Sequence, residues 1–80
     1  MNSMHVVYNS PHYYVVEYPG QNGFELVNRQ HGKGTFLRGD IASSFRQSLA
    51  NVIADSPSVE VVDEFLGNFD GLMNQPTVYH

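Results

Sequence analysis

Apolar residues change their spacing along the chain near Asp40. Before Asp40 they alternate with polar residues or come in pairs of β-branched and aromatic side chains, which is typical of strands. After Asp40 they recur every three or four residues, which is typical of amphipathic helices. Strands followed by helices predict an α+β domain, in which helices cover one face of an antiparallel sheet.

Four short strands are predicted in the first half of the chain. They are separated by turn clusters that are rich in Asn, Ser, Pro and Gly. Turns this short join antiparallel neighbours, so we expect a four-stranded antiparallel β-meander. The predicted strands are residues 4–8, 13–18, 24–29 and 35–38, which makes residues 4–38 the sheet.

Two helices are predicted after the sheet, at about residues 41–54 and 59–73, and their short connection makes them an antiparallel hairpin. Asp40 and Ser58 are expected to be their N-caps, because their side-chain oxygens can accept the free N–H groups of a first turn. Pro57 ends the first helix, and residues 74–80 remain as a tail. The apolar stripes of the two helices are Ile41, Phe45, Leu49, Val52 and Ile53, and then Val59, Val62, Phe65, Leu66, Phe69, Leu72 and Met73.

The two faces of the sheet follow from the rule that successive strand residues point to opposite sides. We expect the helical hairpin to rest on the face that carries Met4, Val6, Tyr8, Tyr14, Val16, Tyr18, Phe24 and Leu26. The other face then carries an apolar patch of Val7, Tyr13, Val15 and Val27, with Leu37 at its boundary.

An apolar patch on an uncovered sheet face predicts an interface, either in a homodimer or with another protein. A small domain that builds little core alone strengthens that interpretation. The alternatives are that the tail folds back over the patch, or that these are scattered surface side chains. If the patch is an interface, Glu in place of Tyr13 or Val15 disrupts self-association and leaves the helices intact.

The second predicted helix carries four acidic residues, most of them opposite its apolar stripe. Carboxylates three or four residues apart can bind Mg²⁺ or Ca²⁺ or share a proton, but no calcium-binding loop pattern is present. Acidic residues on the polar side of an amphipathic helix are usually solvated. We therefore interpret Glu60, Asp63, Glu64 and Asp70 as an acidic docking face for a partner.

The histidines provide an alternative, in which the domain binds a metal or a small ligand. His5 and His12 can approach each other across the first hairpin, and Glu17 is the nearest acidic candidate for a third ligand. His31 lies in a turn and His80 ends the chain, so both are expected to be exposed. The acidic helix face is the other candidate for such a site.

Composition limits the classes of function. The 80 residues form one domain with no cysteine, and four Lys/Arg against eight Asp/Glu disfavour nucleic-acid binding. No signal peptide or long apolar run is present, so we expect a cytoplasmic protein that does not enter a membrane. No catalytic constellation or cofactor motif is present either, so we expect a non-enzymatic interaction or regulatory domain without a cofactor.

The chain also resembles a small uncharacterised family of beta-proteobacteria, a domain of unknown function. The resemblance is carried by residues 8–11, 14–17, 23–27 and 45–46, most strongly by 62–67 and 69–73, and by Gln75, Pro76 and His80. It covers nearly the whole chain, although the family pattern has a longer loop between Tyr18 and Gly23. The resemblance implies a stand-alone bacterial cytosolic polypeptide and brings no known activity, cofactor or site.

Overall fold

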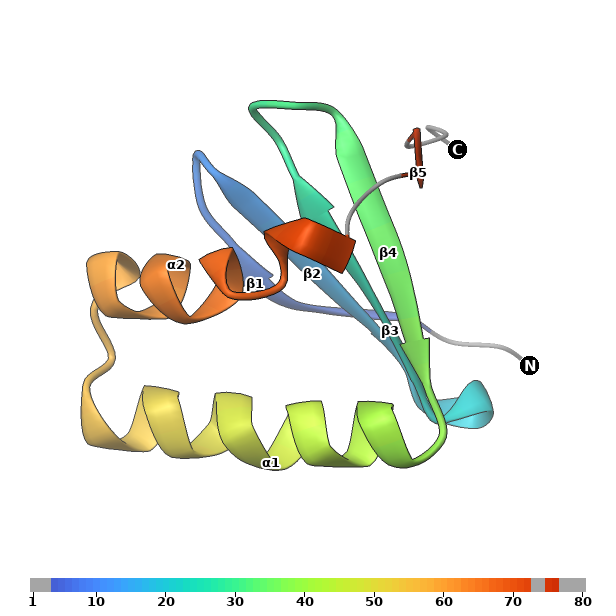
Figure 1. Cartoon of the computed structure of the whole chain (residues 1–80). Coiled ribbons are helices and arrows are strands. Elements are labelled where there is room, and N and C mark those ends of the chain that lie inside the picture. The colour runs from blue at the N-terminus through green and yellow to red at the C-terminus, as the bar shows by residue number, and fades with distance from the viewer. Residues whose placement is uncertain (1–3, 73–74, 77–80) are drawn as a thin grey trace.

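The computed structural model describes residues 4–72 and the backbone of residues 75–76, and it confirms the α+β fold. An antiparallel sheet in the order β1-β2-β3-β4-β5 is followed along the chain by two helices, and only its short edge strand β5 comes after them (Figure 1). The strands are β1 (His5–Asn9), β2 (Tyr13–Tyr18), β3 (Gly23–Asn28), β4 (Lys33–Arg38) and β5 (Gln75–Pro76). The helices are α1 (Asp40–Asp55) and α2 (Val59–Gly67), with short 3-10 helices η1 (Pro19–Gln21) and η2 (Asp70–Leu72).

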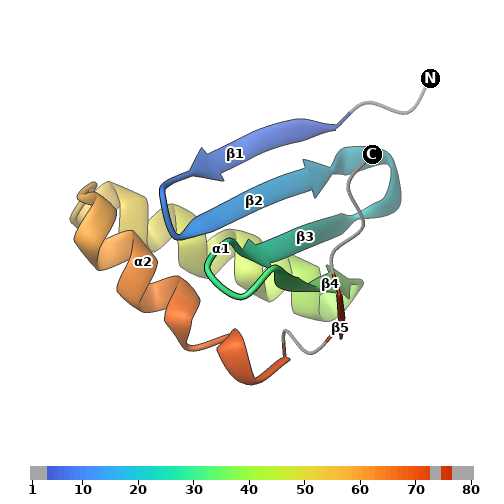
Figure 2. The same ribbon diagram turned by 90° about the horizontal axis from the view of Figure 1, so that it is seen from above.

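The two helices run antiparallel on one side of the sheet, and the core lies between the two layers (Figures 1 and 2). Phe45 of α1 is the centre of an aromatic cluster, with ring centroids 5.0 Å from Phe24, 5.9 Å from Phe65 and 5.3 Å from Phe69. The buried core consists of Tyr13, Val15, Phe24, Leu26, Leu37, Ala42, Phe45, Leu49, Val62 and Leu66.

The register of the sheet reverses the predicted faces of β2. Val15 lies opposite Leu26, and directly opposed residues share a face. Val15 therefore points toward the helices together with Leu26, while Val16 points away from them. The pairing depends on the connection after β2, where η1 and a left-handed Asn22 (φ 46°) set the register. A bulge between Val6 and Tyr8 also puts Tyr8 on the helix side, whereas Val6 stays opposite Val16.

The predicted interface on the open face is therefore wrong. Val15 (0 % exposed) and Tyr13 (8 % exposed) are part of the core beneath the helices, and Val7 packs against that core. Val27 is opposite Tyr14 and so lies on the other face, where it is buried. The four residues therefore do not form a patch on the open face. The face that the helices leave uncovered carries instead Tyr14, Val16, Tyr18, Val27 and Phe36.

The caps of the helices follow the sequence prediction in one case out of two. Ser58 Oγ accepts a hydrogen bond from the Val61 N–H at 3.2 Å, which confirms Ser58 as the N-cap of α2. At α1 the cap is Gly39 and not Asp40, because the chain turns there with φ 67°, a conformation that favours glycine. Asp40 becomes the first residue of the helix.

The second helix is shorter than predicted. It ends at Gly67, after which the Phe69 N–H bonds to Leu66 O at 2.9 Å and tighter turns lead into η2. Part of the predicted tail is ordered, since residues 75–76 pair with β4. Met73 of the predicted apolar stripe, Asn74 and the rest of the tail with His80 lie outside the described residues. Within the described part of the chain, no helix is long and apolar enough to cross a membrane.

Candidate functional site

Asp63 of α2 faces the tip of the β1–β2 hairpin, where three side chains converge on its carboxylate. Its Oδ1 accepts hydrogen bonds from the Tyr8 hydroxyl at 2.8 Å and the Ser10 hydroxyl at 2.9 Å. Its Oδ2 lies 2.9 Å from His12 Nδ1. Burial acts to raise the pKa of Asp63, but the hydrogen bonds from His12, Tyr8 and Ser10 outweigh it, and the pKa is lowered. The carboxylate therefore clamps the hairpin to the helix in its ionised form.

Ser10, His12 and Asp63 have the residue types of a catalytic triad but a different geometry. In a triad the histidine accepts the proton of the serine, whereas Ser10 Oγ donates to Asp63. Ser10 Oγ also accepts from the backbone N–H groups of His12 (3.1 Å) and Tyr13 (3.0 Å). Ser10 therefore shapes the turn, and the arrangement serves as a structural clamp.

Asp70 makes a second link between the helical segment and the sheet. Its carboxylate accepts hydrogen bonds from the Tyr13 hydroxyl at 2.9 and 3.1 Å and from Asn28 Nδ2 at 3.3 Å. Burial, followed by this hydrogen bond, raises the pKa of Tyr13 to about 12, so the phenol remains a donor at neutral pH. Asn28 is buried, and its Oδ1 accepts from the N–H groups of Gln30 and His31. The β3–β4 turn and η2 are thus held together through one amide.

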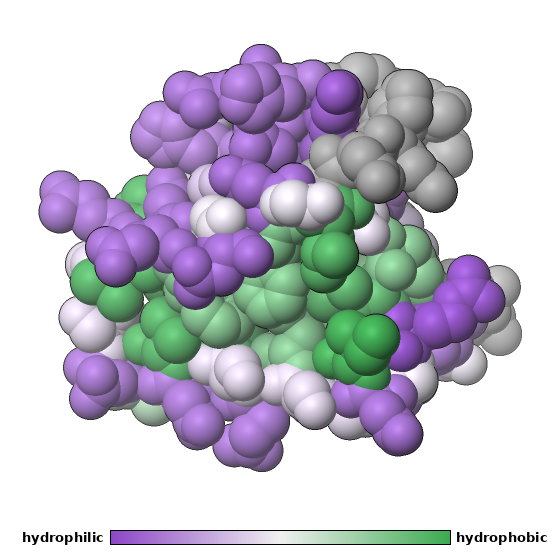
Figure 3. Space-filling view, in the orientation of Figure 1, coloured by the Kyte–Doolittle hydropathy of each residue, from purple (hydrophilic) through white to green (hydrophobic). Residues whose placement is uncertain are grey.

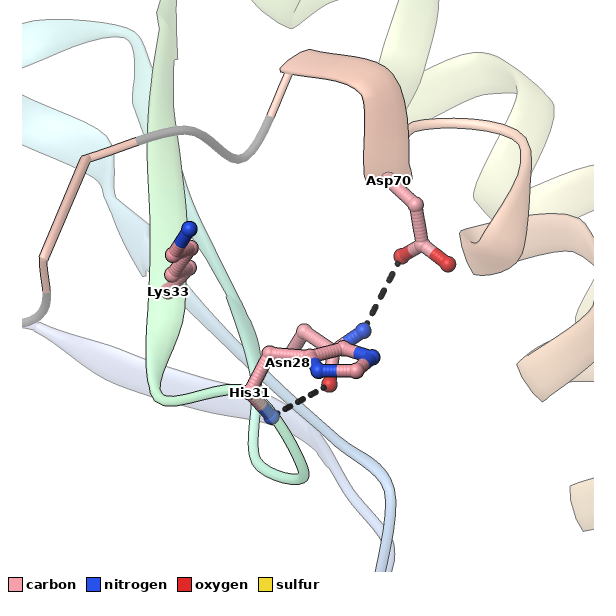
Figure 4. Close-up of a pocket in the computed structure, with 4 residues that line it drawn as sticks. All are labelled: Asn28, His31, Lys33 and Asp70. Atoms are coloured by element: carbon pink, nitrogen blue, oxygen red, sulfur yellow. Dashed lines mark hydrogen bonds between the residues drawn. The ribbon is translucent and has the colours of Figure 1, made fainter.

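A hollow of about 380 Å³ opens beside this link, between the β3–β4 turn and η2 (Figure 4). Asn28 and Asp70 form one wall, joined by their hydrogen bond, while His31 lies beneath Asp70. Lys33 of β4 lies on the other side. The residues that line it in the described part of the chain, Asn28, His31, Lys33 and Asp70, are polar or charged, so the hollow suits a polar ligand.

The predicted acidic docking face is divided by the structure. Asp63 and Asp70 turn toward the sheet and accept hydrogen bonds, which corrects their assignment to the solvated side. Only Glu60 and Glu64 are exposed members of that face without such bonds in the described chain. The difference arises because α2 lies beside the β1–β2 hairpin, whose hydroxyls provide donors for Asp63.

The predicted metal site on the first hairpin is not assembled. His5 lies opposite Glu17 at one end of the hairpin, whereas His12 lies at the other end beside Asp63. Glu17 is instead paired with Arg46, whose Nη2 lies 3.0 Å from its Oε2. Over residues 4–72 no three His, Asp or Glu side chains are grouped closely enough to hold a metal ion.

Hydrophobic side chains also gather in a belt between α1 and α2, with hydrophilic side chains on either side (Figure 3). Val61 and Phe65 lie one turn apart on α2, and the ring of Phe69, just after the helix, lies 5.5 Å from that of Phe65. Ile41 lies one turn before Phe45, whose ring packs against Phe65 and Phe69. We call Ile41, Val61, Phe65, Phe69 and Leu72 the helix-pair surface; Ile41 is 61 %, Val61 39 % and Leu72 53 % exposed.

Charge around the helix-pair surface has one sign. The exposed carboxylates of Asp40 and Asp55 on α1 and of Glu60 and Glu64 on α2 lie on the outward sides of the two helices. Residues 40–72 contain six acidic residues and a single cation, Arg46, which is bound to Glu17. The apolar belt is thus flanked by negative charge that no basic residue of the helices offsets.

Sequence reasoning missed the donors of the two clamps and the helix-pair surface. Nothing in the sequence marks Tyr8, Ser10 or Asn28 as partners of acidic residues far along the chain. The surface did have a signal, because α2 is apolar at Val61 as well as at Val62, which widens its apolar stripe toward one side. A helix that packs on one sheet buries only part of so wide an apolar face.

Comparisons with known proteins agree with the family resemblance. The sequence profile of the family described as "Protein of unknown function (DUF3567)" matches residues 4–80. Protein BTH_I0359 of Burkholderia thailandensis is 42 % identical over an alignment 85 residues long, which covers 96 % of this chain and 100 % of that protein. No solved structure matches the chain.

Proposed function

The chain belongs to the DUF3567 family of bacterial proteins of unknown function, and we propose a role for it from its surface. It is a non-enzymatic interaction domain that binds a cationic amphipathic segment of a partner protein. The observation that carries this proposal is the exposed helix-pair surface, which has hydrophilic side chains on either side (Figure 3), together with the exposed carboxylates of α1 and α2. A cytoplasmic location is part of the proposal.

The apolar part of the proposal rests on exposure. Ile41, Val61 and Leu72 keep between 39 % and 61 % of their surface in water, next to the half-buried rings of Phe65 and Phe69. Contiguous apolar surface of this kind on a small domain marks a binding site more often than scattered residues do. The seam between two antiparallel helices suits the apolar side of a third helix.

The charge part of the proposal identifies the kind of partner. A segment with Lys or Arg on its polar side places these cations beside Asp40, Asp55, Glu60 and Glu64, which favours fast association and excludes acidic segments. A second copy of this chain on the same surface places like charges together. Self-association through the helix-pair surface is therefore disfavoured.

A peptide titration tests the proposal. A fluorescein-labelled amphipathic helix built from Leu and Lys is titrated with the protein, and a Leu/Glu peptide with the same apolar pattern is the control. We expect the anisotropy to rise with the Leu/Lys peptide only, and the affinity to fall as salt is added, because exposed ion pairs are screened.

Two isoleucines of α1 provide a matched pair of variants. Ile41 is on the helix-pair surface, whereas Ile53, which is 38 % exposed, lies about 120° further around the helix. Since burying an isoleucine contributes about 1.5–3 kcal/mol, Ile41→Ser is expected to weaken binding about tenfold or more. Ile53→Ser is expected to leave it unchanged. Equal losses in both variants, or equal binding of the Leu/Glu peptide, contradict the proposal.

A further inference from the structure

The hollow between the β3–β4 turn and η2 has walls of opposite charge. Asp70 lies on the η2 side and Lys33 on the opposite side, on β4, while His31 of the β3–β4 turn lies beneath Asp70 (Figure 4). The hollow of about 380 Å³ is at the small end of the range of ligand pockets, which starts at about 300 Å³. A hollow of this size and lining suits a small polar molecule and not a folded segment of a protein.

The Asp70 carboxylate is held by neutral donors. Tyr13 and Asn28 orient it through hydrogen bonds, and the raised pKa of Tyr13 keeps that phenol protonated at neutral pH. In the part of the chain that the structure describes, Asp70 has no ion pair with a basic side chain. A fixed carboxylate without a cation is matched by a ligand ammonium group.

The β3–β4 side of the hollow carries side chains that can bind an anionic group. Lys33 and His31 are exposed, and over residues 4–72 neither side chain is paired with a carboxylate. Lys33 lies opposite Asn28 in the β3–β4 register, so its place relative to the Asp70 wall is fixed by the sheet. A lysine that lines a small hollow can provide its ammonium group to a ligand carboxylate.

We propose that this hollow binds a free α-amino acid, with the ligand ammonium on Asp70 and the ligand carboxylate on Lys33 and His31. The buried amide of Asn28 keeps the two walls together, because it bonds to both Asp70 and the turn that carries His31. This binding site is separate from the helix-pair surface and does not depend on the protein-interaction role.

The test is a ¹H–¹⁵N NMR titration of the protein with each of the twenty amino acids at millimolar concentration. The expected result is a saturable shift of the Asn28, His31, Lys33 and Asp70 amides with at least one of them. The N-acetylated and the carboxamide derivatives of that amino acid each lack one charge, so both are expected to bind at least tenfold more weakly. The absence of any saturable shift, or derivatives that bind as tightly as the free amino acid, overturns the proposal.

Variants add a second test on the same titration. Asp70→Asn and Lys33→Gln each remove one charge, and each is expected to weaken binding at least tenfold. Lys33 is exposed, so Lys33→Gln keeps the test valid even if Asp70→Asn reduces folding. Glu64→Gln removes an exposed charge outside the hollow and is the matched control. Binding that is unchanged in Lys33→Gln overturns the proposal, whatever the peptide titration of the helix-pair surface shows.

Discussion

Replacing Asp63 with alanine tests the clamp between α2 and the β1–β2 hairpin. The substitution removes hydrogen bonds from the hydroxyls of Tyr8 and Ser10, at 2.8 and 2.9 Å, and the contact with His12 at 2.9 Å. The Asp63 side chain is only 14 % exposed, so water replaces these partners poorly. Glu64 is the matched control, because it is the next residue of the same helix and is exposed.

The size of the effect follows from these contacts. A hydrogen bond to a charged group contributes about 1.5–3 kcal/mol to the free energy of unfolding. The bonds from the two hydroxyls are only partly buried, so we assign each the lower end of that range. The His12 contact adds little, since that ring is 51 % exposed. Alanine regains about 0.6 kcal/mol of helix propensity. We expect Asp63→Ala to lower the free energy of unfolding by about 2–3 kcal/mol, which corresponds to roughly 10 °C or more in Tm for a domain of this size.

Urea unfolding followed by far-UV circular dichroism measures this difference at pH 7. Glu64→Ala is expected to stay within about 0.5 kcal/mol of the natural chain. Equal unfolding midpoints for Asp63→Ala and Glu64→Ala refute the clamp, because the two variants differ only in whether the lost carboxylate was bonded.

The same clamp predicts a dependence on pH. The pKa of Asp63 is lowered in the folded state, so the unfolded chain binds the proton more readily. The stabilisation is therefore present above the unfolded value of about 3.9 and is lost as the pH falls through the folded value. The difference in the free energy of unfolding between the natural chain and Asp63→Ala is therefore expected to shrink as the pH falls below about 3.9. A difference that stays constant down to pH 2 contradicts this mechanism.

Three further changes have expected outcomes. Val15→Glu is expected to abolish the cooperative far-UV transition, because it buries a charge in the core, and a folded variant contradicts the register described above. Tyr13→Phe loses the bond to Asp70 and is expected to reduce the tyrosine absorbance change near pH 12, to which Tyr8 and Tyr18 can also contribute because their pKa values are raised; an unchanged titration contradicts the assignment. Gly34→Ala places a Cβ 2.6 Å from a backbone carbonyl of the neighbouring strand and is expected to lower the urea midpoint, while Gly71→Ala, with no atom within 4 Å, is expected not to.

The order of the elements could be predicted from the sequence because local chemistry sets it. Pro57 cannot extend α1 beyond its C-terminus, Ser58 caps α2, and the turn residues lie between short runs of β-branched and aromatic side chains. These signals depend on neighbours in the chain. They gave the correct fold class without any knowledge of the packing.

The faces of the sheet could not be predicted in the same way. Alternation divides β2 into Tyr13 and Val15 on one side and Tyr14 and Val16 on the other, but both sets are apolar. The choice between them depends on pairing Val15 with Leu26, and a shift by one residue reverses every side chain. A sequence shows which face of a strand is buried only when the residues of the other face are polar.

The roles of the acidic residues also depended on the packing. A helical wheel places Asp63 and Asp70 at the edge of the apolar stripe and Glu60 and Glu64 opposite it, but it contains no information on what lies beside the helix. The structure places the hydroxyls of Tyr8 and Tyr13 there, more than 50 residues earlier in the chain. Glu60 and Glu64 point further outward and remain available to a partner.

The most direct test of the proposed function is an NMR map of the surface that a partner contacts. The ¹⁵N-labelled protein is titrated with the Leu/Lys peptide, and the shifts are assigned residue by residue. We expect shifts at Ile41, Val61, Phe65 and Leu72 and none at Phe36 on the face of the sheet that the helices leave uncovered. Shifts confined to the sheet face, or no saturable shift at all, contradict the proposal that the helix-pair surface is the docking site.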